Sequence, residues 1–253
     1  MDRIKDNNMT KFEVCCNSFL SASNAEDAGA DRIELCSNLQ NGGTTPTFGL
    51  LKLCCQRINT PINVLIRPRG GDFLYSEDEF EEIKQEIQKC KIFHVNGVVC
   101  GILTSDGNID VKRTKELVEL AHPMKFTFHR AFDLSRDPMQ SLKDIIETGA
   151  DHILTSGMAK TAYEGRKLIA ELVKAAGDKI TILPGGGINE SNIKALAKAT
   201  KATEFHFSAS KVTESKMTFR RENILGKVED DYTLTYSDTD TIINIKKQLL
   251  SAK

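Results

Sequence analysis

Short apolar runs alternate along this chain with longer segments in which apolar residues recur every three or four positions. The short runs predict β-strands, and the three-to-four spacing predicts amphipathic helices that bury one face. The expected strands are residues 12–15, 33–36, 63–67, 97–103, 125–129, 152–155, 180–183 and 204–207. The expected helices are residues 18–28, 48–57, 76–90, 111–121, 137–149, 162–176, 189–199 and 238–250. Strands and helices therefore alternate from one end of the chain to the other.

Several helix boundaries carry recognisable end signals. Ser76 is followed three residues later by Glu79, which is the spacing of a capping box. Asp137 precedes Pro138, a favoured first helical residue, and Gly149 supplies a helix end. These signals support the order of elements read from the apolar pattern.

Eight strand–helix units in about 250 residues predict an α/β fold of the TIM (β/α)8 barrel type, as a single domain. We expect residues 1–10 to be a flexible tail and residues 11–253 to form the barrel domain. Residues 211–236 make an extended segment before the last helix, long for a loop of a barrel. This segment could cover the barrel mouth or dock on another subunit, and the sequence does not choose between them.

The net charge, the length of the apolar runs and the cysteine content limit the kinds of molecule that the protein is expected to bind. The net charge of −1 gives no basis for nucleic-acid binding, and no apolar run reaches the roughly 20 residues that span a bilayer, so we expect no membrane partner. Seven cysteines form an odd number without repeated spacing or a Cys-x-x-Cys motif. This usage is typical of a reducing compartment, so we expect a cytoplasmic protein, with the nucleus as the alternative. We also expect that the protein has no organic cofactor.

Two of the expected strands share an unusual pattern of glutamate, aliphatic residue and cysteine. Side chains two positions apart in a strand point the same way, so Glu13 shares a face with Cys15, and Glu34 shares a face with Cys36. If helices cover the outside of the barrel, this face points into its interior. Buried carboxylates need partners, so the pattern indicates a site.

Functional residues of TIM barrels lie at the carboxyl ends of the strands. The catalytic candidates at these ends are Glu13, Glu34, Arg67 and His129. A structural alternative is a buried ion-pair network in which Arg67 neutralises the two glutamates.

A second group of residues is suited to holding an anion. Glycines let the backbone approach a ligand, and the start of a helix offers free N–H groups. The turn before the helix expected near Asn189 is glycine-rich, and Ser208 follows the last barrel strand. The anion-binding candidates are Arg67, Arg69, Gly185, Gly186, Gly187 and Ser208. A tight turn without a ligand remains the alternative.

Cys15 and Cys36 end neighbouring strands and could share one soft metal ion. Two thiolates suit Cu(I), which prefers sulfur ligands. On spacing alone, two reduced and inert core thiols are the favoured explanation.

The chain resembles the CutC copper-homeostasis family in an ordered series of motifs from about residue 11 to residue 211. The most specific motifs are Arg-Pro-Arg-Gly-Gly-Asp at residues 67–72 and Phe-His-Arg-Ala-Phe-Asp at residues 128–133; the others lie at residues 14–15, 29–36, 42–46, 154–157 and 184–187. The resemblance implies a cytoplasmic TIM barrel, usually a homo-oligomer, that binds Cu(I) and helps to control cellular copper. It places the copper-linked cysteines of animal members on Cys15 and Cys36.

Two other hypotheses remain open at this point. One is an enzyme, an isomerase, lyase or hydrolase, acting on a small phosphorylated or anionic substrate. The other is a non-catalytic oligomeric scaffold whose extended segment mediates assembly. The expected partner is therefore a copper ion or a small anionic molecule.

Overall fold

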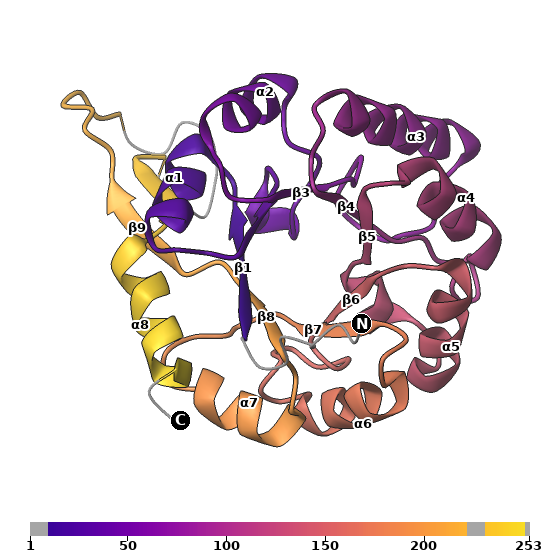
Figure 1. Ribbon diagram of the computed structural model, residues 1–253. Coiled ribbons are helices and arrows are strands. Elements are labelled where there is room, and N and C mark those ends of the chain that lie inside the picture. Colours follow the sequence, from indigo (N-terminus) through magenta and orange to yellow (C-terminus); the bar gives the residue numbers. More distant parts are fainter. Residues whose placement is uncertain (1–9, 222–230, 251–253) are drawn as a thin grey trace, which may run out of the picture.

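The protein is described from a computed structural model, which covers residues 10–221 and 231–250. Eight parallel strands form a barrel, and helices surround it on the outside (Figure 1). The barrel strands are β1 Lys11–Cys16, β2 Arg32–Leu35, β3 Ile62–Leu65, β4 Gly97–Cys100, β5 Lys125–Phe128, β6 His152–Thr155, β7 Thr181–Pro184 and β8 Glu204–Phe207. The α-helices are α1 Phe19–Asp27, α2 Phe48–Arg57, α3 Glu77–Ile92, α4 Val111–Ala121, α5 Pro138–Thr148, α6 Arg166–Ala176, α7 Ile193–Thr200 and α8 Thr239–Leu250.

The strand order runs from β7 down to β1 and then to β8, and a parallel bridge between Gly185 and His206 joins the two remaining edges. The TIM-barrel prediction is confirmed. Two short 3-10 helices, η1 Leu39–Asn41 and η2 Arg130–Leu134, follow β2 and β5 at the carboxyl ends of the strands. Among the described residues, the helices are all too short or too polar to cross a membrane.

The predicted end signals act as expected. The Ser76 side chain accepts from the backbone N–H of Glu79, and the Glu79 carboxylate accepts from the N–H of Ser76. Asp137 caps α5 ahead of Pro138, and Gly149 ends that helix with a left-handed backbone at φ +84°. Each device satisfies backbone groups that a helix end leaves without partners.

The outward faces of the strands and the inward faces of the helices form one large apolar core. Val14, Ile33 and Phe126, which point outward from their strands, are at most 1% exposed. Inside the barrel, a small separate apolar cluster contains only Cys15, Cys36, Leu65 and Val99, with Leu39 packed on it. Most inward positions around this cluster are polar, so the barrel interior depends on hydrogen bonds and ion pairs rather than on apolar packing alone.

The extended segment forms an antiparallel arm outside the barrel. Strands β9 Ser210–Glu214 and β10 Thr233–Ser237 pair with each other, and the arm projects away from the ring of helices near α1 and α8 (Figure 1). Its described residues are absent from the wall of the cavity at the barrel mouth. The expected tail at residues 1–10 lies almost wholly outside the described residues.

Candidate functional site

The carboxyl ends of the strands enclose a cavity of about 290 Å³. Its wall combines the thiol of Cys15 and the carboxyl group of Glu34 with basic and apolar side chains and a glycine turn. The lining residues are Cys15, Glu34, Leu39, Gly42, Gly43, Leu65, Arg67, Phe73, His129, Arg130, Leu154, Gly186, Gly187, Ile188, His206, Phe207 and Ser208. This is the place where a TIM barrel carries its function.

Glu13 lies below this cavity, in a network at the lower end of the barrel. It pairs with Arg32, which also donates to Glu204 at 2.9 Å, and it accepts from Asn63 at 3.1 Å. The parallel register places Glu13 directly beside Arg32, one layer below Cys15 and Glu34. The predicted buried ion-pair network therefore exists, but the prediction that Arg67 neutralises the glutamates was wrong. Arg67 follows β3 at the upper end; Arg32 is the ion-pair partner of Glu13, and His206 is that of Glu34.

His206 on β8 connects the lower network to the cavity. Its Nδ1 lies 2.8 Å from Glu13 Oε1, and its Nε2 lies 3.4 Å from Glu34 Oε2. Burial alone would lower the pKa of His206, but the charge of Glu34 and the hydrogen bonds to Cys15 and Glu13 raise it well above its ordinary value. Burial would raise the pKa of Glu13, yet His206 and Arg32 lower it to about 2. Glu13 is therefore an ionised carboxylate that orients a cationic imidazole.

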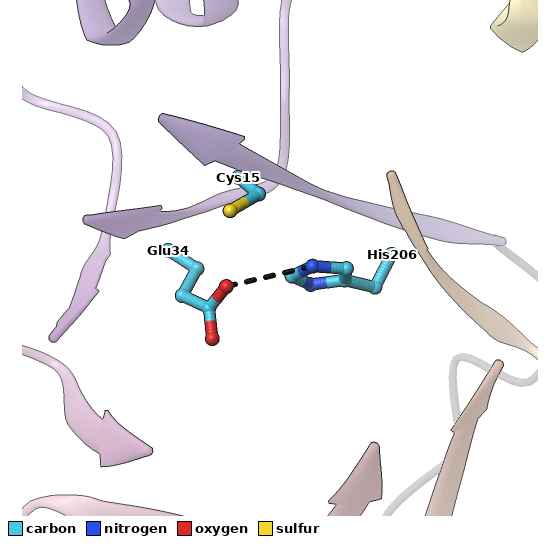
Figure 2. A group of neighbouring side chains, drawn as sticks. All are labelled: Cys15, Glu34 and His206. Atoms are coloured by element: carbon cyan, nitrogen blue, oxygen red, sulfur yellow. Dashed lines mark ion pairs between the residues drawn. The ribbon is translucent and has the colours of Figure 1, made fainter. Parts of the chain in front are cut away.

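Cys15, Glu34 and His206 come from three neighbouring strands and point toward one another (Figure 2). One donor atom from each lies within 4.8 Å of the others, which is close enough to converge on one metal ion. Burial raises the pKa of Glu34, although the charge of His206 opposes this shift. The two buried glutamates thus differ: Glu13 has a cationic partner on each side, whereas Glu34 is the acid that faces the cavity.

Cys36 lies behind Cys15, and their Sγ atoms are 3.6 Å apart. Cys15 borders the cavity, whereas Cys36 is completely buried and its thiol points toward the carbonyl of Cys16 at 3.6 Å. The hydrogen bond to Cys36, together with burial, raises the pKa of the Cys15 thiol. All seven cysteines are free thiols. Burial raises the pKa of Cys90 and Cys100 to about 12, which is typical of inert core thiols.

Arg67 and His129 lie on the side of the cavity formed by β3 and β5. The two terminal nitrogens of Arg67 donate to the carbonyls of Asn41, Gly43 and Gly71, each at 2.8 Å. The guanidinium group lies over the ring of Phe73, which also contacts the His129 ring at 4.8 Å between centroids. Burial and the charge of Arg67 lower the pKa of His129 to about 3, so its imidazole is neutral.

The predicted anion-binding residues do not all meet in the cavity. Arg69 points outward and binds Glu79 and Asp72, and the N–H of Gly185 donates to the carbonyl of Thr155. Gly186, Gly187 and Ser208 line the cavity with Arg67.

The helix expected near Asn189 begins only at Ile193. The Asn192 side chain accepts from the N–H of Asn189 and donates to the carbonyl of Gly187, which makes a turn there instead. The start of α7 therefore does not follow the glycine turn directly.

Three residues of the interior network were absent from the sequence-based candidates: Arg32, Asn63 and Glu204. The period-two alternation of side chains in a strand could have identified two of them. Arg32 lies two residues before Glu34, and Glu204 lies two residues before His206, so each shares a face with that neighbour. Both side chains had to point inward if their neighbours did. Asn63 had no comparable signal.

The comparisons with known proteins agree with one another. A profile of the CutC family matches residues 10–211. A CutC family protein of Parabacteroides distasonis is 49% identical over 214 residues, which cover 84% of this chain and 88% of that protein. The copper homeostasis protein cutC homolog of Homo sapiens is 46% identical over 213 residues, covering 84% of this chain and 78% of the human protein.

Solved structures give the same result. The crystal structure of CutC from Streptococcus agalactiae superposes with a TM-score of 0.75 at 30% identity, and it covers 79% of this chain and 99% of that one. Phosphoribosylanthranilate isomerase from Thermotoga maritima reaches a TM-score of 0.59 at 11% identity, over 96% of this chain and 100% of the isomerase chain, which shows the barrel fold alone. With a matching profile over most of its length and relatives of this similarity, the chain belongs to the CutC family.

Proposed function

We propose that this protein binds Cu(I) through the thiolates of Cys15 and Cys36 and thereby takes part in copper homeostasis. The observation that carries the proposal is the pair of free Sγ atoms 3.6 Å apart, formed by Cys15 at the wall of the mouth cavity and Cys36 behind it. Thiolate pairs select Cu(I) over harder divalent ions. The names of the curated relatives support a role in copper homeostasis for the family.

The surroundings of the two thiols fit a monovalent soft ion. His206 would offer Nε2 from the same side once copper displaces the proton of that nitrogen, while its Nδ1 is held by the Glu13 carboxylate. This arrangement is common around metal-binding histidines, where a carboxylate fixes the ring orientation and increases the basicity of the ligand. Glu34 offers a carboxylate oxygen, a donor better suited to hard ions, so we assign it to shaping the pocket with Arg67 and His129 rather than to holding copper.

Binding requires that the thiol protons leave. Cys15 holds its proton at neutral pH because Cys36 and burial raise its pKa. Copper affinity should therefore increase with pH, because the ion competes with protons for sulfur.

An anaerobic Cu(I) titration against a chromophoric chelator tests the proposal. We expect about one tightly bound Cu(I) per chain, and an affinity reduced at least about 100-fold in the variant that combines Cys15→Ser with Cys36→Ser. Cys55→Ser is the matched control, because Cys55 is partly exposed on α2. Equal affinity of the double variant and the wild type would exclude this pair as the copper site.

We also propose a cytoplasmic location and self-association through the arm. The seven free thiols suit a reducing compartment. Val212 and Leu234 on the arm are 66% and 56% exposed, which favours a contact that covers them. Light scattering of a Val212→Ser, Leu234→Ser variant should show a smaller assembly than the wild type. An unchanged mass would argue against the arm as the contact.

A further inference from the structure

The mouth cavity carries a positive charge that no acidic group of the described residues neutralises. Arg67 lines the cavity and is 5% exposed, and no carboxylate of the described chain lies within ion-pair distance of it. Its terminal nitrogens donate to three neutral carbonyl groups of the loops, so none of these acceptors supplies a negative charge. Buried charges in folded proteins are normally paired, so an unpaired guanidinium at a cavity wall indicates a ligand of opposite charge.

The neighbouring histidine adds a hydrogen-bond donor on the same side. His129 Nδ1 accepts from the backbone N–H of Ala131, so the proton of the neutral ring resides on Nε2. This buried Nε2–H has no acceptor among the described residues. A buried donor left without a partner is costly, and such groups in native proteins call for an explanation.

The glycine turn after β7 offers further donors at the same cavity. Gly186 and Gly187 have left-handed backbones at φ +102° and +69°, and both line the cavity. Their N–H groups donate to no acceptor in the described parts of the chain. A Cβ on Gly187 would lie 2.9 Å from Thr161 Cγ2, so the turn keeps its form only with glycine. Successive backbone N–H groups of this kind bind anions.

Two other basic side chains at the cavity have acidic partners. Arg130 is paired with Asp133 at 2.7 Å, and His206 lies between Glu13 and Glu34. Among the described residues, Arg67 is therefore a cation of the cavity wall without a carboxylate partner. Leu65, Phe73 and Ile188 also line the cavity, so its middle is apolar.

We propose that the cavity binds a small organic anion, with its carboxylate or phosphate group held by Arg67, the Nε2–H of His129 and the Gly186–Gly187 turn. The volume of about 290 Å³ is at the lower end of the range for ligand pockets, so the ligand is a small metabolite with a short apolar body. Its far end lies toward Glu34 and His206. The proposal does not depend on copper binding by Cys15 and Cys36, because its donors are on other residues.

Calorimetric titration of the full chain with inorganic phosphate and, separately, with butyrate tests the proposal at an ionic strength held constant with chloride. We expect saturable binding of at least one of the two anions, and the anion bound more tightly identifies the phosphate or the carboxylate class. In protein labelled with ¹⁵N-histidine, the same anion should shift the Nε2 resonance of His129 in a saturable way. Absence of saturation with both anions would overturn the proposal.

Variants connect the binding to the assigned residues. Arg67→Met should weaken binding at least about tenfold, as expected for the loss of a charge-assisted contact, and Arg67→Lys should restore part of it. The matched control is Arg69→Met, which removes an arginine two residues away that points outward, and its affinity should stay within about twofold of the wild type.

His129→Phe retains a ring beside Phe73 and should also weaken binding, so a failure of Arg67→Met to fold leaves the test intact. Wild-type affinity in a folded Arg67→Met or His129→Phe protein would overturn the assignment. The titrations use copper-free protein, so the outcome for the anion is independent of the outcome of the copper titration.

Discussion

The lower and upper halves of the barrel interior differ in whether their buried charged side chains are paired with opposite charges. In the lower half, Arg32 lies between Glu13 and Glu204, so each charge has an opposite charge beside it. In the upper half, the Arg67 guanidinium has no carboxylate partner among the described residues, and Cys15 and Glu34 face a cavity. Both halves present ionisable side chains in the same alternating pattern. What separates a structural network from a candidate binding site is whether the groups satisfy one another.

The largest expected effect concerns the lower half. Arg32→Met should destabilise the protein by about 3–5 kcal/mol, because it leaves two buried carboxylates without their shared cation. Denaturant unfolding followed by circular dichroism measures this loss. Arg113→Met, which breaks a pair with the exposed Glu77, is the control and should cost about 1 kcal/mol or less through that pair. Equal losses in the two variants would mean that the lower network is not structural.

The second-largest expected effect is a loss of folding stability at acidic pH, caused by protonation of Glu204 in the lower half. Burial disfavours the charged form of Glu204, but His152 and Arg32 outweigh this effect and lower its pKa from 4.5 to about 2. A lowered pKa in the folded state stabilises the fold above the unfolded value, so this contribution is complete above pH 4.5 and is lost as the pH falls toward 2. It amounts to about 3 kcal/mol.

Unfolding curves between pH 6 and pH 2 should therefore show a smaller loss of stability on acidification for Glu204→Gln than for the wild type. Parallel pH dependences of the two proteins would show that Glu204 has the same pKa in the folded and unfolded states.

A third prediction concerns the orientation of His206, the side chain that contacts both Glu13 in the lower half and Glu34 in the upper half. Glu13→Gln should lower Cu(I) affinity by about 10–100-fold, since Glu13 orients His206 without reaching the cavity itself. Glu204→Gln serves as the matched control, because it changes the same Arg32 network without touching His206. Equal Cu(I) affinities of the Glu13→Gln and Glu204→Gln variants would show that Glu13 does not act on copper binding through His206.

The smallest expected effect comes from a buried hydroxyl. Thr127 Oγ1 is inside the barrel and has no hydrogen-bond partner among the described residues. Thr127→Val replaces it with a methyl group of similar shape, so the free energy of unfolding should stay equal or rise by up to about 1 kcal/mol. A clear loss of stability in thermal unfolding would show that the hydroxyl is satisfied by an ordered water.

The sequence by itself determined the elements and the direction of their side chains. Alternation within each strand has a period of two, so the inward orientation of Glu13, Cys15 and Glu34 followed once helices covered the outside. Capping residues such as Ser76 and Asp137 set helix starts through local hydrogen bonds, and these too could be predicted.

Only the tertiary structure decided how far along the barrel axis each inward side chain lies and which other side chain it pairs with. The parallel register places Arg32 beside Glu13, whereas Arg67 lies above β3 and binds loop carbonyls. It also brings the Sγ atoms of Cys15 and Cys36 to 3.6 Å, a distance that their spacing in the chain does not determine. The physical reason is that register depends on how neighbouring strands slide and tilt in the closed barrel, which is a property of the whole sheet. The sequence could therefore predict which side chains face inward, but not which of them pair.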